Sequence, residues 1–174
     1  MEWLKNFFRN FLSAFSAAKE VAPAPPPQIK SEHPWLDMAL IDAESGLWKE
    51  IPGEKHNPLI VEALRISGLS RTHLKDETMW CGAYVNKRLK DEGITGLPAS
   101  PAWAASWLKF GKRLPGFKRG AIACVPSKSA NSGYHVTFAD KLAGEILYCV
   151  GGNQGNTVRR QAYPSKGVVY LWPK

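Results

Sequence analysis

The sequence predicts an α+β protein in which helices come first and an antiparallel sheet of about five strands follows. Apolar residues recur at helical spacing as far as Gly111, with Gly and Pro at the segment ends. After Gly116 the pattern changes to short apolar runs and alternating segments, which are typical of strands. Helices and strands that are segregated in this way fit an α+β arrangement. The 174 residues suffice for one domain with its own core and a short extension.

Residues 1–20 have the spacing of an amphipathic helix. The stretch is interrupted too often for a membrane span, which needs about twenty mostly apolar residues. Arg9 and Asn10 also break the apolar core that a signal peptide requires. Its apolar face consists of Trp3, Leu4, Phe7, Phe8, Phe11, Leu12 and Phe15.

A Pro-rich linker over residues 21–31 is expected to separate this helix from a domain over residues 32–174. A helix beyond an extended spacer does not easily bury its apolar face on its own domain. We therefore expect residues 1–20 to bind a membrane surface or a protein partner. The alternative is that the helix folds back on the domain or is stabilised by oligomer contacts.

Four helices are expected in the first part of this domain. Pro near the start and Gly near the end indicate their limits. Thr78 is placed to cap the third helix. The helices are expected from Pro34 to Gly46, from Pro58 to Ser67, from Met79 to Glu92 and from Pro101 to Gly111.

Five strands are expected after these helices. Gly144 turns the second strand into the third, as in a hairpin. The strands are expected over residues 120–125, 135–140, 145–150, 157–163 and 168–172.

The formal net charge of +8 at pH 7 favours an anionic partner, such as a membrane surface or a bacterial envelope polymer. No run of Lys and Arg reaches five residues, and there is no zinc-finger or Arg-rich signature. We therefore expect no nucleic-acid partner.

The three cysteines are Cys81, Cys124 and Cys149, and no two of them have metal-ligand spacing. We expect neither a metal nor a cofactor. Cys124 and Cys149 lie in apolar strand-like runs, where they either form a pair or are small buried hydrophobes. The second interpretation is favoured because free Cys is among the most buried residue types.

Cys81 lies where the third helix begins, and we interpret it as a nucleophile. The positive end of the helix dipole favours a thiolate. Asp76 and Glu77 are close in sequence and oppose this field, so a protonated histidine partner is required. The competing interpretation is that Cys81 shares one helical face with Val85 and Leu89 and belongs to the core.

His135 is the best candidate for the base among the four histidines. It opens a strand, and a strand end holds a side chain rigidly. The base needs an orienting group on its other ring nitrogen. Asn153 follows the next strand, after two glycines that let the backbone turn, and can therefore reach His135.

These motifs, in this order, resemble those of papain-like bacterial and phage cell-wall hydrolases of the CHAP and NlpC type. The resemblance covers roughly residues 33–174 and is strongest with a phage and prophage branch. Many CHAP enzymes have a Glu just before the orienting Asn, where this chain has Gly152. The motifs are Trp80-Cys81-Gly82-Ala83, His135-Val136, Gly151-Gly152-Asn153-Gln154, Pro34-Trp35, Glu50-Ile51-Pro52-Gly53, His56-Asn57-Pro58 and Trp172-Pro173.

The resemblance implies a papain-like fold and the hydrolysis of a peptidoglycan amide bond, in the stem peptide or at its sugar link. It implies Cys81 as the nucleophile, His135 as the base and Asn153 as the orienting residue, with Gln154 as the fallback. Residues expected to contact substrate or to line the groove are Trp80, Trp103, Trp107, Gln154, Glu50 and His56. For the three tryptophans, packing in the core is the alternative.

A phage lysin or a secreted wall-degrading enzyme or toxin fits these expectations. It would act in the bacterial periplasm or cell wall, exported or released without a clear signal peptide. The alternative is a non-catalytic module of the same fold, in a virion or secretion system, that binds the wall or a partner. A pure binding module has no need for the Cys-His-Asn order.

Overall fold

The computed structural model of the protein describes residues 31–174. The helix expected over residues 1–20, and all of the linker except Ser31, lie outside the described residues. No helix in the described part is long and apolar enough to cross a membrane.

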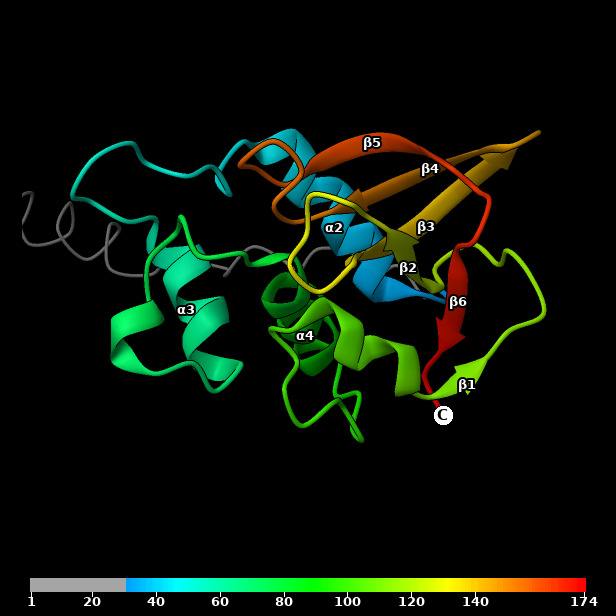
Figure 1. The fold of residues 1–174 in the computed structure, drawn as a ribbon, viewed down its shortest axis with the longest axis horizontal. Coiled ribbons are helices and arrows are strands. Elements are labelled where there is room, and N and C mark those ends of the chain that lie inside the picture. Colours follow the sequence, from blue (N-terminus) through cyan, green and yellow to red (C-terminus); the bar gives the residue numbers. More distant parts are fainter. Residues whose placement is uncertain (1–30) are drawn as a thin grey trace, which may run out of the picture. The chain divides into compact units, whose positions relative to one another are not determined.

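Five helical segments are described, three of them α-helices and two of them 3-10 helices (Figure 1). The segment expected from Pro101 begins instead at Ala104 as a 3-10 helix, because residues 101–103 form a turn. The helical segments are α2 (Pro34–Ser45), α3 (Pro58–Ile66), η1 (Arg71–His73), α4 (Cys81–Asp91) and η2 (Ala104–Lys109).

Six strands form one antiparallel sheet in the order β1-β6-β2-β3-β4-β5, which confirms the α+β class. The expected number was five. The additional strand, β1, has only two residues, which is too short to leave a pattern in the sequence. The strands are β1 (Lys112–Arg113), β2 (Ile122–Pro126), β3 (Tyr134–Ala143), β4 (Ile146–Gly151), β5 (Arg159–Pro164) and β6 (Val169–Trp172).

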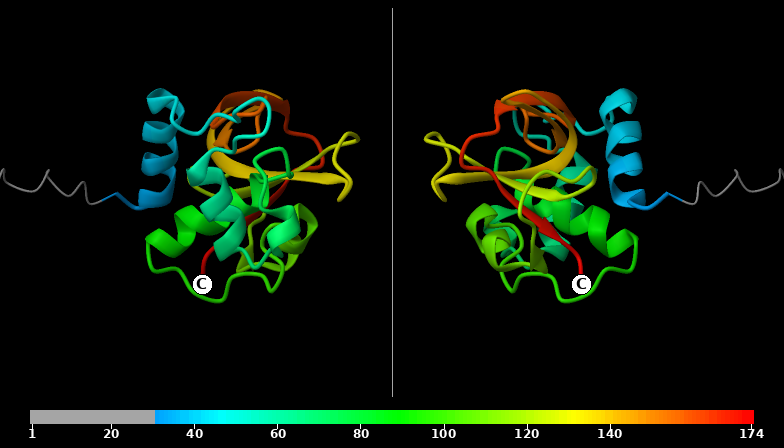
Figure 2. Two further views of the ribbon diagram at one scale, coloured as in Figure 1. Left: turned by 90° about the vertical axis from the view of Figure 1, so that its left-hand side faces the viewer. Right: turned by 90° about the vertical axis from the view of Figure 1, so that its right-hand side faces the viewer.

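Both faces of the sheet are buried, in two separate cores. Successive side chains of a strand point to opposite faces. Ile122 and Cys124 of β2 therefore join the core that the helices cover, while Ala121, Ala123 and Val125 join the second core. Figure 2 shows the sheet bending over from β3 to β5, which helps to enclose the second core.

Helix α4 connects the helical part of the domain with the sheet. It packs against α3 on one side and against β3 on another. Most of its side chains are buried, from Cys81 to Leu89. Its first turn therefore lies close to the first residues of β3 (Figure 1).

Candidate active site

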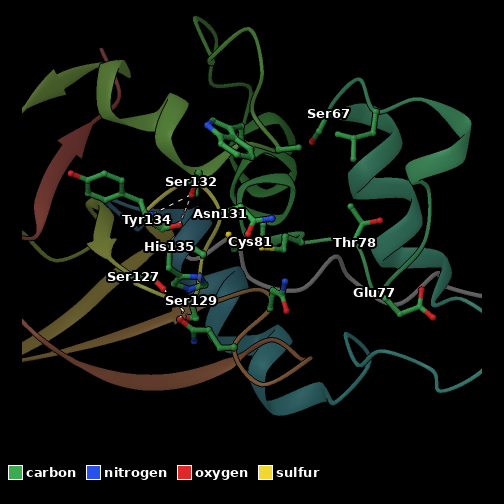
Figure 3. Close-up of a pocket in the computed structure, with 18 of the residues that line it drawn as sticks. Ser67, Glu77, Thr78, Cys81, Ser127, Ser129, Asn131, Ser132, Tyr134 and His135 are labelled. Carbon is green, nitrogen blue, oxygen red and sulfur yellow. Dashed lines mark hydrogen bonds between the residues drawn. The ribbon is translucent and has the colours of Figure 1, made fainter.

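A pocket of about 1100 Å³ opens at the start of α4. Its lining includes Cys81 and His135, which Figure 3 shows close together near the centre of the view. The loop between β2 and β3 forms one side of the pocket with Ser127, Ser129 and other small polar residues. The pocket thus combines a thiol and an imidazole with a wall of hydroxyl groups.

Cys81 is the first residue of α4 and is 8 % exposed. The residue before it, Trp80, makes no side-chain cap, so the first N–H groups of the helix stay available. Burial alone raises the pKa of Cys81. The charge of His135, its hydrogen bond and the backbone N–H groups of Val136 and Gly82 outweigh burial and lower this pKa below the ordinary thiol value.

His135 shows the reciprocal shift. Burial alone lowers its pKa, but the negative charge of Cys81 and hydrogen bonds with Cys81 and Gln154 raise it above the ordinary value. The two shifts have opposite directions and each residue is a cause of the other's. The arrangement therefore favours a thiolate–imidazolium pair.

Gln154 is the residue that holds the imidazole ring. Its Oε1 lies 3.2 Å from His135 Nε2 and also accepts hydrogen bonds from Thr137 Oγ1 (3.1 Å) and the Tyr163 hydroxyl (3.2 Å). Its Nε2 donates to the carbonyl of Arg159, which fixes the orientation of the amide. Because an amide oxygen only accepts, His135 Nε2 carries the proton, and Nδ1 is the nitrogen left for Cys81.

The register of β3 explains why one amide reaches two of these groups. His135 and Thr137 are two residues apart in the strand, so their side chains point to the same face. Gln154 lies beyond the end of β4, which pairs with β3, and its side chain is 1 % exposed. Gln154 lines the pocket, and the contact that its amide oxygen makes there is with the base.

Asn153, expected to orient the base, lines the pocket and is half-buried. The hydrogen bond to His135 comes instead from the fallback residue, Gln154. Asn153 has a left-handed backbone (φ 56°), and this places the side chain of the following residue against the ring.

The two glycines before Asn153 are needed for close packing. A Cβ on Gly151 would lie 2.4 Å from Thr137 Oγ1, and one on Gly152 would lie 2.4 Å from the ring of Trp80. Neither glycine has a left-handed φ, so close packing and not backbone freedom requires glycine at these two positions. A Glu side chain at position 152 would not fit here, because its Cβ would also lie 2.6 Å from Tyr84 Cβ.

Tyr163 belongs to the site and was missed by the sequence analysis. Its ring lies 5.7 Å from that of His135, tilted by 33°, and its hydroxyl donates to Gln154. Burial raises its pKa well above the ordinary value, so the hydroxyl keeps its proton. A Tyr in an alternating strand gives no sequence signal for such a role.

The tryptophans divide between the core and the pocket. Trp80 is fully buried and stacks on Trp48, with ring centroids 6.3 Å apart. Trp107 is also fully buried, and its Nε1 donates to the Pro101 carbonyl (2.8 Å). Neither Trp80 nor Trp107 offers a surface to substrate, whereas Trp103 is 47 % exposed and lines the pocket.

Glu50 lines the pocket, and its Oε1 accepts a hydrogen bond from Trp80 Nε1 (2.9 Å). Burial raises the pKa of Glu50, the Trp80 hydrogen bond lowers it, and the nearby charges of Asp76 and Glu77 raise it further. The net direction is upward. Glu50 therefore holds Trp80, the residue before Cys81, by a hydrogen bond and also lines the pocket.

His56 is not part of the pocket lining. Its Nδ1 lies 2.9 Å from Asp76 Oδ1, while Asp76 Oδ2 accepts hydrogen bonds from the backbone of Ile51 (2.9 Å) and Asn57 (2.8 Å). Burial alone would raise the pKa of Asp76, but these hydrogen bonds lower it. The Asp76 carboxylate thus holds the loop together. From the sequence, its negative charge is expected to oppose the thiolate, but the groups that shift the pKa of Cys81 do not include Asp76.

His56, Asp76 and Glu77 also bring three possible ligand atoms within 4.8 Å of one another. Both oxygens of Asp76 already accept hydrogen bonds from the protein. We therefore interpret the group as part of the loop structure and assign no metal to it.

All three cysteines are free, so Cys124 and Cys149 are buried thiols and not a pair. Burial raises the pKa of Cys124 to about 12, with a further contribution from the charge of Cys81. Burial likewise raises the pKa of Cys149 far above the ordinary value. The downward shift at Cys81 therefore comes from its particular neighbours and not from burial.

Cys81, His135 and Gln154 thus have the relative placement of a nucleophile, a base and a group that orients the base. Such a set can attack a carbonyl carbon and pass a proton to the leaving group. Comparisons with protein-family models, with curated proteins and with solved structures give no significant match to the chain.

Proposed function

We propose that this protein is a cysteine peptidase or amidase of papain-like fold that cleaves an amide bond of peptidoglycan. The observation that carries the proposal is the Cys81–His135 pair. The two residues lower the pKa of the thiol and raise the pKa of the imidazole, each against the effect of burial. Cys124 is also buried, and its pKa moves the opposite way. A binding module has no use for a thiol whose pKa is lowered beside a held imidazole.

The reaction follows from these parts. The Cys81 thiolate attacks the carbonyl carbon, and the C=O electron pair moves onto oxygen, where N–H groups at the start of α4 stabilise it. The C–N bond breaks as His135 gives its proton to the leaving amine. Water, deprotonated by His135, then cleaves the thioester, which releases the acid and restores the thiolate–imidazolium pair.

Peptidoglycan as the substrate is supported by three further observations. The ordered motifs resemble those of cell-wall hydrolases. The net charge of +8 suits an anionic envelope. The pocket, at about 1100 Å³, is large enough for several residues of a branched polymer.

The test is digestion of purified peptidoglycan by the wild type, by Cys81→Ala and by Cys124→Ala as a control for loss of a buried thiol. We expect Cys81→Ala to release no fragments and Cys124→Ala to release the same fragments as the wild type. Equal digestion by the wild type and Cys81→Ala would end the cysteine mechanism. Mass spectrometry of the fragments identifies the bond that is cut.

A further inference from the structure

A second hollow, of about 520 Å³, adjoins the catalytic pocket. The two share three lining residues, Ala99, Ser100 and Trp103. The second hollow continues beyond Trp103 to Lys109 and Phe110. A substrate held at Cys81 therefore has a continuous surface on which to extend past Trp103.

Trp103 is an exposed ring on a fixed backbone. Its N–H donates to the Ser100 carbonyl (3.0 Å), and its own carbonyl accepts from the Ser106 N–H (3.0 Å) and the Ser106 hydroxyl (2.7 Å). The ring itself is 47 % exposed, unlike the fully buried Trp80 and Trp107. A rigidly held aromatic face loses little conformational entropy on binding and suits a flat apolar ligand surface.

The segment that precedes Trp103 packs against the first turn of α4, which begins at Cys81. A Cβ on Gly82 would lie 2.4 Å from the Pro101 carbonyl oxygen and 2.7 Å from that of Ala102. The absence of that Cβ lets residues 101–102 lie against the first turn of α4, directly before Trp103. The stacking face and the Cys81 thiol are therefore fixed by the same contact.

The groups around Trp103 favour a sugar over a peptide. Two hydroxyl-bearing residues, Ser100 and Ser106, line the second hollow together with Trp103, and the catalytic pocket that Trp103 also lines includes Ser129 and Ser132. Lys109 is the one charged residue in the described lining of the second hollow. That lining spans residues 96–110 and contains no strand, so it offers no edge to which a peptide could add.

We propose that Trp103 stacks on a pyranose ring of an N-acetylated amino sugar, so that the glycan strand lies across Trp103 while the scissile amide lies at Cys81. This inference rests on the proposed function for the link to catalysis. The sugar site itself is testable without any cleavage.

The probe is the β-1,4-linked tetramer of N-acetylglucosamine, which carries no peptide. Its Kd is measured by calorimetry, and the indole N–H signals of the tryptophans are followed by NMR. Trp103→Ala should raise the Kd about tenfold, because truncation of an aromatic anchor removes most of its contact. Trp103→Phe keeps a stacking face and should bind nearly as well as the wild type.

Tyr148→Ala is the matched control, because Tyr148 is 43 % exposed and lines neither hollow. It should bind the tetramer as the wild type does. The sugar site is overturned if the wild type does not bind the tetramer, or if Trp103→Ala binds it equally well. It is also overturned if Trp103→Ala weakens a sugar-free stem peptide as much as the tetramer, since the occupant is then a peptide.

Failure of the proposed function has a different signature. A wild type that binds the tetramer through Trp103 but leaves peptidoglycan uncut would sink the hydrolase proposal and keep the sugar site. A wild type that digests peptidoglycan without binding the tetramer would keep the hydrolase proposal and overturn the sugar site.

Discussion

At the scale of single residues, Gln154 decides how the His135 ring is presented to Cys81. Gln154→Ala removes the acceptor at His135 Nε2 and leaves the ring free to turn. We expect kcat to fall roughly 10²-fold, the lower end of what a positioned acid–base group contributes. The neighbouring Asn153→Gly removes the side chain but keeps the left-handed backbone, and it should change kcat far less, because the Asn153 side chain does not hold the ring. Kinetics on a soluble peptidoglycan fragment decide between the two, and the reverse order of effects would return the orienting role to Asn153.

The pH dependence should report the same pair. The active form needs a thiolate at Cys81, whose pKa is lowered, and an imidazolium at His135, whose pKa is raised. The value of kcat/KM should therefore rise as pH passes the lower macroscopic pKa of the pair and fall as pH passes the higher one. Gln154→Ala removes one cause of the raised pKa at His135, so the alkaline limb should move to lower pH.

This shift is measured from pH profiles of kcat/KM for the wild type and Gln154→Ala. A structural role alone lowers the whole profile without moving its alkaline limb. An unmoved limb would therefore contradict the assigned hydrogen bond.

The sequence could indicate Cys81 and His135 because their roles depend on a helix start and a strand start, which leave local patterns. It could not choose between Asn153 and Gln154. That choice depends on the left-handed backbone at Asn153, which turns one neighbour toward the ring. It also could not separate buried Trp80 from exposed Trp103, because exposure is set by packing between distant segments.

At the scale of elements, the first turn of α4 depends on Gly82. Gly82→Ala places a methyl group 2.4 Å from the Pro101 carbonyl, so the backbone of residues 101–102 must shift. We expect a loss of about 1–3 kcal/mol in the free energy of unfolding, as for overpacked sites. Activity should fall further than the loss of stability explains, since Cys81 and Trp103 are the residues next to this contact in the chain.

The control is Gly116→Ala, because nothing lies within 4 Å of the Cβ that it adds. Thermal or denaturant unfolding gives the stabilities of both variants. A Gly82→Ala protein as stable and active as Gly116→Ala would show that residues 101–102 are free to move away.

The limits of α4 could be predicted to within two residues, from Met79–Glu92 in the sequence to Cys81–Asp91 in the structure. The cap was wrong, because the Thr78 hydroxyl donates to the His73 carbonyl (2.9 Å) and leaves the helix start uncapped. The local sequence cannot show whether the Thr78 hydroxyl caps the helix that follows or bonds to the carbonyl of a residue before it. In the proposed mechanism, the uncapped start keeps N–H groups for the thiolate and the oxyanion.

At the scale of the whole molecule, residues 31–174 form a compact unit that holds the entire candidate site. A chain that lacks residues 1–27 should therefore fold and keep its kcat/KM on soluble fragments. The apolar pattern of residues 1–20 predicts that the same truncation abolishes partitioning onto anionic lipid vesicles. Truncation should thus remove lipid binding and leave hydrolysis intact.

Point variants of the full chain sharpen this prediction. Phe11→Ser lies on the predicted apolar face and should weaken vesicle binding, while Ser13→Ala on the polar face should not. Sedimentation with vesicles measures both, and release of soluble fragments monitors hydrolysis in the same samples. Equal sedimentation of the full and truncated chains would remove the lipid role and leave a protein partner for this segment. Loss of hydrolysis on truncation would instead place part of residues 1–27 in the site.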